Sequence, residues 1–192
     1  MKRTIFALLA AASLSGHAAT VTVTPSDVTD PVITLTVTSA TTFDVGGAGG
    51  KNAVGLLLAT DTVALAGTFT NRAVRVDGGN VAADAPLQLQ LRGATITGNG
   101  TAYEPLSLTG KARAALTLRG SSTLAPPSGN LTALRVPSYA ADNYCSLTIA
   151  GDGALTAVGS GTGAGIGGGA EANVGVAGGE NGGEIIIEGG AE

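Results

Sequence analysis

The first part of the chain alternates threonine with valine, isoleucine or leucine in steps of two. The pattern is clearest at Thr20–Thr24 and at Val32–Val37. A period of two places the apolar side chains on one face of an extended backbone, so the pattern predicts β-strands. Prolines and aspartates interrupt the alternation, and the glycine-rich stretch at 46–50 ends it. We therefore expect a β leader and a glycine-rich turn at 19–50.

From residue 63 onward a five-residue unit recurs, in which two apolar residues alternate with any residue and glycine follows. In several copies another apolar residue comes soon after the glycine, so the unit predicts a strand, a tight corner and a second strand. Glycine suits such a corner because it adopts positive φ without the steric cost of a Cβ atom. The seven copies begin at Val63, Val74, Leu89, Leu106, Leu116, Leu147 and Ile185.

The spacing between these copies is irregular, which excludes repeat proteins with a strict helical period such as ankyrins. Irregular spacing favours an all-β fold, a right-handed parallel β-helix (β-solenoid), in which loops of any length leave the corners between stacked strands. The alternative is an antiparallel β-sandwich, although that fold usually has aromatic core residues. We expect the solenoid region at 51–192, and its end one turn after a strand without a polar cap is typical of a chain truncated at the carboxyl terminus.

Composition supports a folded chain without a large enzyme-like core. Aromatic residues make up only 3% of the chain and 31 of its 192 residues are glycine, so the large side chains that fill helical or α/β enzyme cores are scarce. Charged residues make up 12% and the mean hydropathy is +0.33, which argues against charge-rich disorder. The glycine-rich repeats therefore belong to a structure built from small and β-branched residues.

The amino terminus has the pattern of a bacterial secretory signal peptide at 1–18. Lys2 and Arg3 precede an apolar stretch at 4–14, and Gly16-His17-Ala18 forms a small-residue cleavage site. The apolar stretch is shorter than the about 20 residues that span a bilayer. We therefore expect cleavage after Ala18, a secreted or cell-surface location and no membrane span.

Cleavage would remove the only histidine, His17, and this limits the chemistry of the mature chain. Ser-His-Asp triads and histidine-ligated metal sites are then excluded. We predict no catalytic residues, no metal site and no cofactor. The negative net charge also argues against nucleic acid as a partner.

A carboxylate pair would support the alternative of a polysaccharide lyase or hydrolase on a β-helix. No two acidic residues occupy positions i and i+2 along one predicted strand, the spacing that would place both on one face. Asp77 and Asp152 lie in glycine-rich sequences that predict turns, where aspartate bonds the nearby backbone. The four candidate acids are Asp77, Asp84, Asp142 and Asp152.

The sole cysteine, Cys145, rules out an internal disulfide. It shares the alternation of Leu147 and Ile149, so we expect its side chain to face the core. We interpret it as a small core residue.

Two glycine-rich stretches carry a family resemblance. Gly-Ala-Gly-Ile-Gly-Gly-Gly at 163–169 is followed by Gly-Gly-Glu-Ile-Ile-Ile-Glu-Gly-Gly at 182–190. This combination resembles repeats of bacterial surface proteins of the adhesin type that form parallel β-helices and carry carbohydrate-binding domains. The resemblance implies a surface β-solenoid, and it covers only residues 147–190.

Two groups of side chains could bind carbohydrate or a host or cell-surface glycan. Tyr139 and Tyr144 flank a polar loop that contains Asp142 and Asn143, and a tyrosine face with neighbouring polar groups is the minimal arrangement for stacking and hydrogen-bonding a sugar ring. Five arginines on or beside strands could line one face that contacts acidic polysaccharide: Arg72, Arg75, Arg92, Arg113 and Arg119.

These observations predict a surface adhesin or scaffold that binds carbohydrate and is not an enzyme. A self-associating matrix protein is a third hypothesis, because an uncovered strand edge at the end of the solenoid could pair with another chain.

Overall fold

The computed structural model describes residues 18–79, 81–100, 102–140, 143–169 and 181–188. The predicted signal peptide therefore lies outside the described residues except for Ala18. The regular structure of the described residues is β-strand apart from two short 3₁₀ turns, Pro25–Asp27 and Gly49–Lys51. None of these residues forms a helix long and apolar enough to cross a membrane. The all-β class that the sequence predicts is confirmed.

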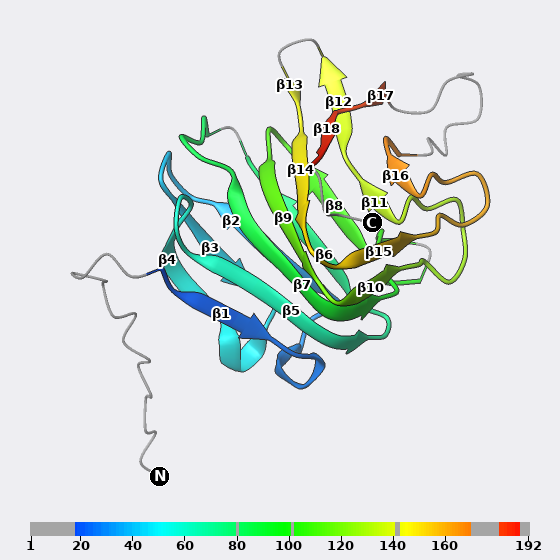
Figure 1. Ribbon diagram of the computed structural model, residues 1–192, viewed down its shortest axis with the longest axis horizontal. Coiled ribbons are helices and arrows are strands. Elements are labelled where there is room, and N and C mark those ends of the chain that lie inside the picture. Colours follow the sequence, from blue (N-terminus) through cyan, green and yellow to red (C-terminus); the bar gives the residue numbers. More distant parts are fainter. Residues whose placement is uncertain (1–17, 80, 101, 141–142, 170–180, 189–192) are drawn as a thin grey trace.

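Two large sheets and one small sheet contain all the named strands (Figure 1). The eight-stranded sheet consists of β1 (Thr20–Val23), β5 (Thr62–Phe69), β7 (Leu87–Ile96), β9 (Arg113–Arg119), β10 (Ser121–Leu124), β14 (Ser146–Gly151), β15 (Ala154–Ala157) and β18 (Glu184–Ile187). The seven-stranded sheet consists of β2 (Val32–Val37), β3 (Thr42–Gly46), β4 (Ala53–Leu57), β6 (Ala73–Asp77), β8 (Leu106–Thr109), β11 (Leu134–Arg135) and β16 (Ile166–Gly167). The small sheet consists of β12 (Pro137–Ala140), β13 (Asn143–Tyr144) and β17 (Asn181–Gly182).

Parallel pairing dominates the eight-stranded sheet. Its main path runs β1-β5-β7-β9-β14-β18, and every neighbouring pair is parallel. The alternative of an antiparallel β-sandwich is wrong, because segments far apart in sequence pair side by side in the same direction. One row across the sheet contains Val21, Val63, Leu89, Leu116, Ile149 and Ile187 at matching register, and its four central members, Val63, Leu89, Leu116 and Ile149, are buried.

The seven-stranded sheet is mixed. The strands from β16 through β11, β8 and β6 to β2 pair in parallel, whereas β3 and β4 add an antiparallel meander at one edge. The segment 19–50 contributes β1 to one sheet and β2 to the other, so in the structure it joins the same sheets as the later strands.

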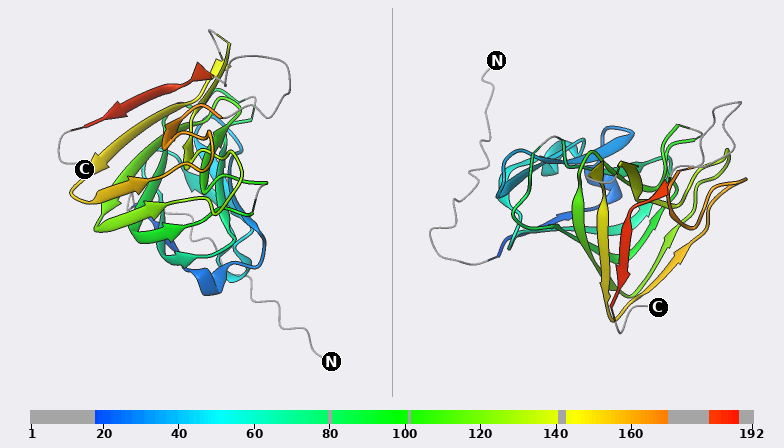
Figure 2. Two further views of the ribbon diagram at one scale, coloured as in Figure 1. Left: turned by 90° about the vertical axis from the view of Figure 1, so that its right-hand side faces the viewer. Right: turned by 90° about the horizontal axis from the view of Figure 1, so that it is seen from above.

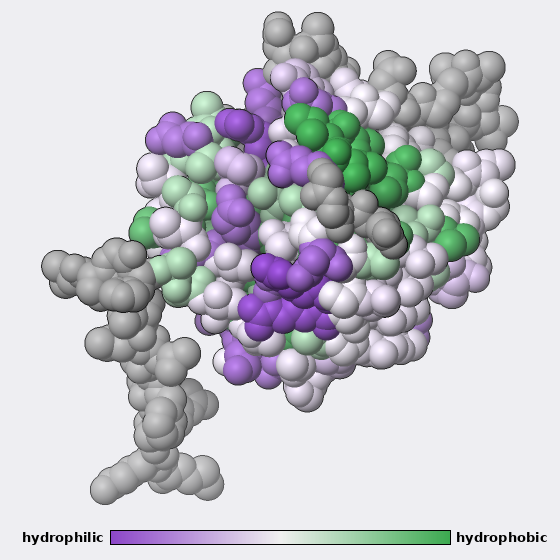
Figure 3. Space-filling model, viewed as in Figure 1, coloured by the Kyte–Doolittle hydropathy of each residue, from purple (hydrophilic) through white to green (hydrophobic). Residues whose placement is uncertain are grey.

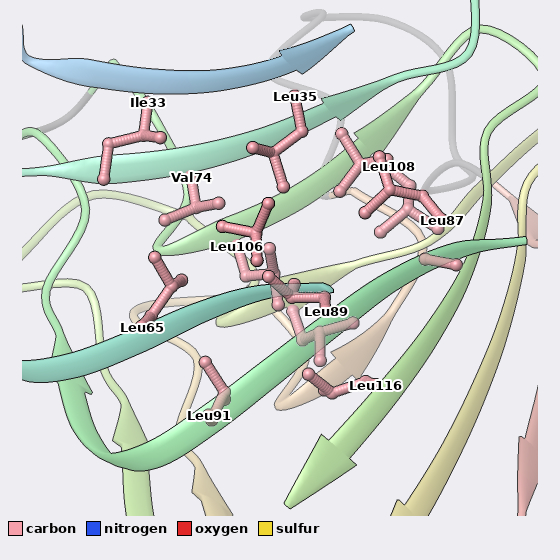
Figure 4. Packing of buried hydrophobic residues seen from close by; sticks show 14 of the residues in the cluster. Ile33, Leu35, Leu65, Val74, Leu87, Leu89, Leu91, Leu106, Leu108 and Leu116 are labelled. Carbon is pink, nitrogen blue, oxygen red and sulfur yellow. The ribbon is translucent and has the colours of Figure 1, made fainter. Parts of the chain in front are cut away.

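The hydrophobic core lies between the two large sheets (Figures 2 and 4). Leu65, Leu89 and Leu116 extend from one sheet toward Ile33 and Leu106 from the other. All five side chains are at most 1% exposed. Cys145 is also buried, and its Sγ donates to the Gly110 carbonyl at 3.3 Å. The prediction that Cys145 faces the core is confirmed.

Most of the predicted corner glycines have the left-handed backbone that the repeat unit predicts. Positive φ occurs at Gly67, Gly93, Gly110, Gly120 and Gly151. Gly78 is different, because a Cβ atom there would lie 2.4 Å from the Ala112 backbone nitrogen. Glycine at that corner allows two chain segments to approach closely. Gly189, the glycine of the last unit, lies outside the described residues.

Beyond three of these glycines the chain turns onto a further ladder. After the bend at Gly93, the end of β7 pairs with β10 at Thr95 and Ile96. β10 follows Gly120 and pairs in parallel with β15, which follows Gly151. The corner glycines therefore redirect successive strands to a common side.

Candidate functional site

A hollow of about 380 Å³ opens on the molecular surface where three neighbouring strands of the eight-stranded sheet begin. Arg113, Ser146 and Glu184 are register partners at the starts of β9, β14 and β18. We call this site the Tyr144 hollow. Its lining consists of Val81, Ala82, Ala83, Lys111, Arg113, Tyr144, Ser146 and Glu184.

The floor of the hollow follows from strand alternation. Ala114 and Leu147 are buried and Ile185 packs against the core, so their neighbours Arg113, Ser146 and Glu184 face the opposite, outer side of the sheet. Parallel pairing then places these three polar residues in one row.

The loop between β6 and β7 forms one wall. Arg113 Nη1 donates a hydrogen bond to the Ala83 carbonyl at 3.3 Å, which ties this loop to the start of β9. Lys111 and Arg113 are both exposed, and neither forms an ion pair with a carboxylate among the described residues. The hollow therefore presents two cationic groups against one carboxylate, that of Glu184, and its net positive charge favours an anionic ligand.

Tyr144, which ends β13 shortly before β14, also lines the hollow. Tyr144 is 46% exposed, and in the antiparallel pairing of β12 and β13 it lies opposite Ser138. Cys145, the next residue, donates its backbone N–H to the Pro137 carbonyl at 3.0 Å. A half-exposed ring held between a paired strand and a buried neighbour offers a face for stacking.

Of the four residues predicted to bind carbohydrate, the structure places the side chain of Tyr144 alone. Asp142 lies outside the described residues. Tyr139 and Asn143 belong to β12 and β13, but their side chains also lie outside the described part of the structure. The structure therefore brings Tyr144 together with Lys111, Arg113, Ser146 and Glu184, which the sequence interpretation did not combine with it.

The five arginines do not line one face, and that hypothesis is wrong. Arg75 lies on β6 of the seven-stranded sheet, with its guanidinium carbon 5.3 Å from the centroid of the Tyr103 ring. Arg92, Arg113 and Arg119 lie on β7 and β9 of the other sheet. These arginines do alternate with buried residues along their strands, as predicted. They do not share a face because β6 belongs to one large sheet and β7 and β9 to the other.

Two of the four candidate acids, Asp77 and Asp152, are held by contacts with other groups. Asp77 Oδ1 accepts the Gly79 backbone N–H at 2.8 Å, as the predicted turn requires. Asp152 Oδ2 forms an exposed ion pair with Arg119 Nη1 at 2.9 Å. Asp84 lies beside a different, mainly apolar hollow of about 150 Å³. The described acidic, histidine and cysteine side chains form no cluster of three that could hold a metal ion.

Comparison with known proteins adds no relative to this geometry. No family model, curated protein or solved structure matches the chain.

Proposed function

We propose that the chain is an exported bacterial surface protein, an adhesin or scaffold built as a right-handed parallel β-solenoid, that binds carbohydrate in the Tyr144 hollow. The observation that carries the proposal is the half-exposed Tyr144 ring beside Lys111 and Arg113 in a hollow of about 380 Å³. Among the described residues that line the hollow, Glu184 is the one carboxylate, and a glycosidase or lyase of this kind would need a pair. We therefore infer binding without catalysis.

The strand pairing supports the solenoid. The chain passes from one long parallel ladder to the other in consecutive strands, as it does between the faces of a coil. The shorter ladder of β7, β10 and β15 adds a further face. Stacked coils make a rigid rod because each coil contributes backbone hydrogen bonds to the next. Such a rod would hold the row Arg113, Ser146 and Glu184 at fixed spacing.

The side chains of the hollow match the chemistry of an acidic sugar. The Tyr144 ring can stack on the apolar face of a pyranose. Lys111 and Arg113 can bind a carboxylate or sulfate group, and the planar guanidinium can do so through two hydrogen bonds. Ser146 and Glu184 offer hydrogen-bonding groups for sugar hydroxyls. We therefore expect uronic-acid-containing or sulfated polysaccharides to bind more tightly than neutral ones.

A glycan array that includes acidic polysaccharides tests this function on the chain recovered after leader removal. We expect specific binding, weakened about tenfold or more by Tyr144→Ala and by Arg113→Ala, which is typical of residues at the centre of a binding site. Tyr144→Phe should retain most of the binding because it keeps the ring. Tyr139→Ala tests the other predicted tyrosine.

Arg119→Ala is the matched control, because Arg119 lies at the other end of the same strand on the same face and outside the hollow. Binding that is equally reduced by Arg113→Ala and Arg119→Ala would indicate a diffuse charge effect and contradict the assigned site. Absence of binding by a folded sample would contradict carbohydrate binding itself.

Self-association is a second candidate function, and the exposed strand β18 favours it. β18 ends the main path of the eight-stranded sheet, and among the described strands β14 is its one partner. Ile186 is 46% and Ile187 61% exposed, and Figure 3 shows apolar residues gathered over β18. An apolar strand edge of this kind can pair with a strand of another copy.

A further inference from the structure

Asp61 is a buried carboxylate immediately before β5, and its two oxygens are held by backbone groups. It is 5% exposed. Oδ2 accepts the Leu57 N–H at 2.8 Å, and Oδ1 accepts the Ala19 N–H at 2.9 Å. Thr60 Oγ1 also lies within hydrogen-bonding distance of Oδ1, at 3.4 Å.

No basic side chain of the described residues neutralises this carboxylate. The ion pairs of the described part of the chain join Arg119 to Asp152 and Arg135 to Glu104. A buried carboxylate that has only neutral donors is less stable than one with a counter-ion at hydrogen-bonding distance. Asp61 therefore sits in a position where a nearby cation would be favourable.

The nitrogen that contacts Asp61 belongs to the residue that follows the predicted cleavage site. Ala19 is held in place by the sheet, because its carbonyl accepts the Thr62 N–H at 2.8 Å and the next residue, Thr20, pairs with Thr62. Ala18 and Ala19 are exposed, so the chain on the amino-terminal side of this contact faces solvent. The distance between Ala19 N and Asp61 Oδ1 is thus set by strand pairing, independently of the leader.

We infer that removal of the leader after Ala18 converts the Ala19 nitrogen into the counter-ion of Asp61. A leader peptidase uses water to break the C–N bond between Ala18 and Ala19. The water leaves a carboxylate on Ala18 and an amine on Ala19, and the amine takes up a proton at neutral pH. The neutral amide donor of the precursor becomes an ammonium group 2.9 Å from a buried carboxylate, so a hydrogen bond between a dipole and an ion becomes an ion pair.

The consequence is a fold that is stabilised by its own processing. In the precursor a neutral amide of Ala19 donates to the Asp61 carboxylate, whereas in the cleaved chain the Ala19 ammonium group does. The folded state therefore gains this stability only after export. This inference rests on the export step of the proposed function and is independent of carbohydrate binding.

The test compares four chains that are recovered from a bacterial export host. Two begin at Ala19, and two carry an additional Gly-Ser dipeptide before Ala19. In each pair one chain has Asp61 and the other has Asp61→Asn. Mass spectrometry of the exported native chain establishes its first residue, and thermal unfolding measures stability.

With Asp61 present, we expect the dipeptide to lower Tm by about 2–6 °C, because the Ala19 nitrogen then donates to Asp61 as a neutral amide instead of as an ammonium group. With Asp61→Asn the dipeptide should change Tm by less than about 1 °C. Equal Tm values in the Asp61 pair, an equal shift in the Asn pair, or a mature chain that begins at another residue would each overturn the inference.

If Asp61→Asn does not fold, the two Asp61 chains still decide the question through their salt dependence. An ion pair at a partly exposed amine weakens in about 0.5 M NaCl, so the Tm difference should shrink. A difference that is unchanged by salt would show a steric effect and overturn the inference. Glycan binding, measured on the same chains, is expected to be equal in all that fold, which separates this result from failure of the proposed function.

Discussion

Gly151 shows how a single residue determines where a strand of this protein bends. Its φ is +118°, and a Cβ atom there would lie 2.3 Å from the Leu118 carbonyl oxygen. Both the backbone conformation and the space therefore require glycine. The same glycine is the last residue of β14, and β15 begins at Ala154, so its conformation positions two strands.

We predict that Gly151→Ala destabilises the fold by about 1–3 kcal/mol, the cost typical of a residue held in an unfavourable backbone region. In a chain of this length the change lowers Tm by roughly 3–10 °C, measurable by thermal unfolding. Gly50→Ala is the matched control, because Gly50 has no atom within 4 Å of the added Cβ. Equal Tm values for the two variants would contradict the steric argument.

Tyr144 and Asp61 differ in how visible they are in the sequence. Tyr144 can be selected as a candidate from the sequence because the chain has only three tyrosines. Asp61 has no such signal: it lies between two threonines in an ordinary strand-flanking sequence, and its partner Ala19 is distant. Its burial and its contact with Ala19 arise only when β1 pairs with β5.

The 3₁₀ turn Pro25–Asp27 between β1 and β2 is an element held by one side chain. Asp27 Oδ2 accepts the Thr24 backbone N–H at 2.8 Å and the Thr24 hydroxyl at 2.8 Å. These hydrogen bonds, first the backbone and then the hydroxyl, lower the pKa of Asp27 below its ordinary value, and the charge of Lys51 acts in the same direction. The ionised carboxylate therefore stabilises the turn.

We predict that this stabilisation is lost in acid. Because the folded-state pKa is lowered, the contribution is fully present above the unfolded value of about 3.9 and disappears as the pH falls through the folded value. The Tm difference between the native chain and Asp27→Asn should narrow between about pH 5 and pH 2. Thr24→Val, which removes the hydroxyl donor, should show a smaller acid-dependent loss than the native chain. A Tm difference that stays constant over this range would contradict the prediction.

The strands themselves follow closely from the repeat unit. Each of the seven units contributes its apolar pair to a strand, and both residues of the pair are buried in β5, β6, β7, β8, β9 and β14. Local alternation is sufficient for this result because adjacent side chains of a strand point to opposite faces. The repeat unit does not predict which sheet each strand joins. Val63 and Leu89 lie in one sheet, whereas Val74, between them in sequence, lies in the other.

In the whole molecule, β18 leaves an apolar edge that is uncovered among the described residues. We predict concentration-dependent association of the cleaved chain, detectable by light scattering. Ile186→Lys places a charge on this edge strand, a common means by which proteins prevent edge pairing, and should reduce the association strongly.

Val54→Lys is the control for this prediction, because Val54 is 68% exposed on β4, at the opposite edge of the other sheet. Association that is unaffected by Ile186→Lys, or reduced equally by Val54→Lys, would contradict pairing through β18. A monomer at all concentrations would leave carbohydrate binding as the supported function.

The amino-acid sequence determined the features that depend on near neighbours in the chain. Period-two alternation predicts strands and the inward position of Cys145, and the repeat unit predicts the left-handed corner at Gly151, because sterics and the pleat act over a few residues. The tertiary structure alone decided which strands are neighbours. Register across distant strands places Arg113, Ser146 and Glu184 in one row, divides the arginines between two sheets and brings Ala19 to Asp61. Those contacts depend on how the whole chain packs and hydrogen-bonds, and no local pattern contains that information.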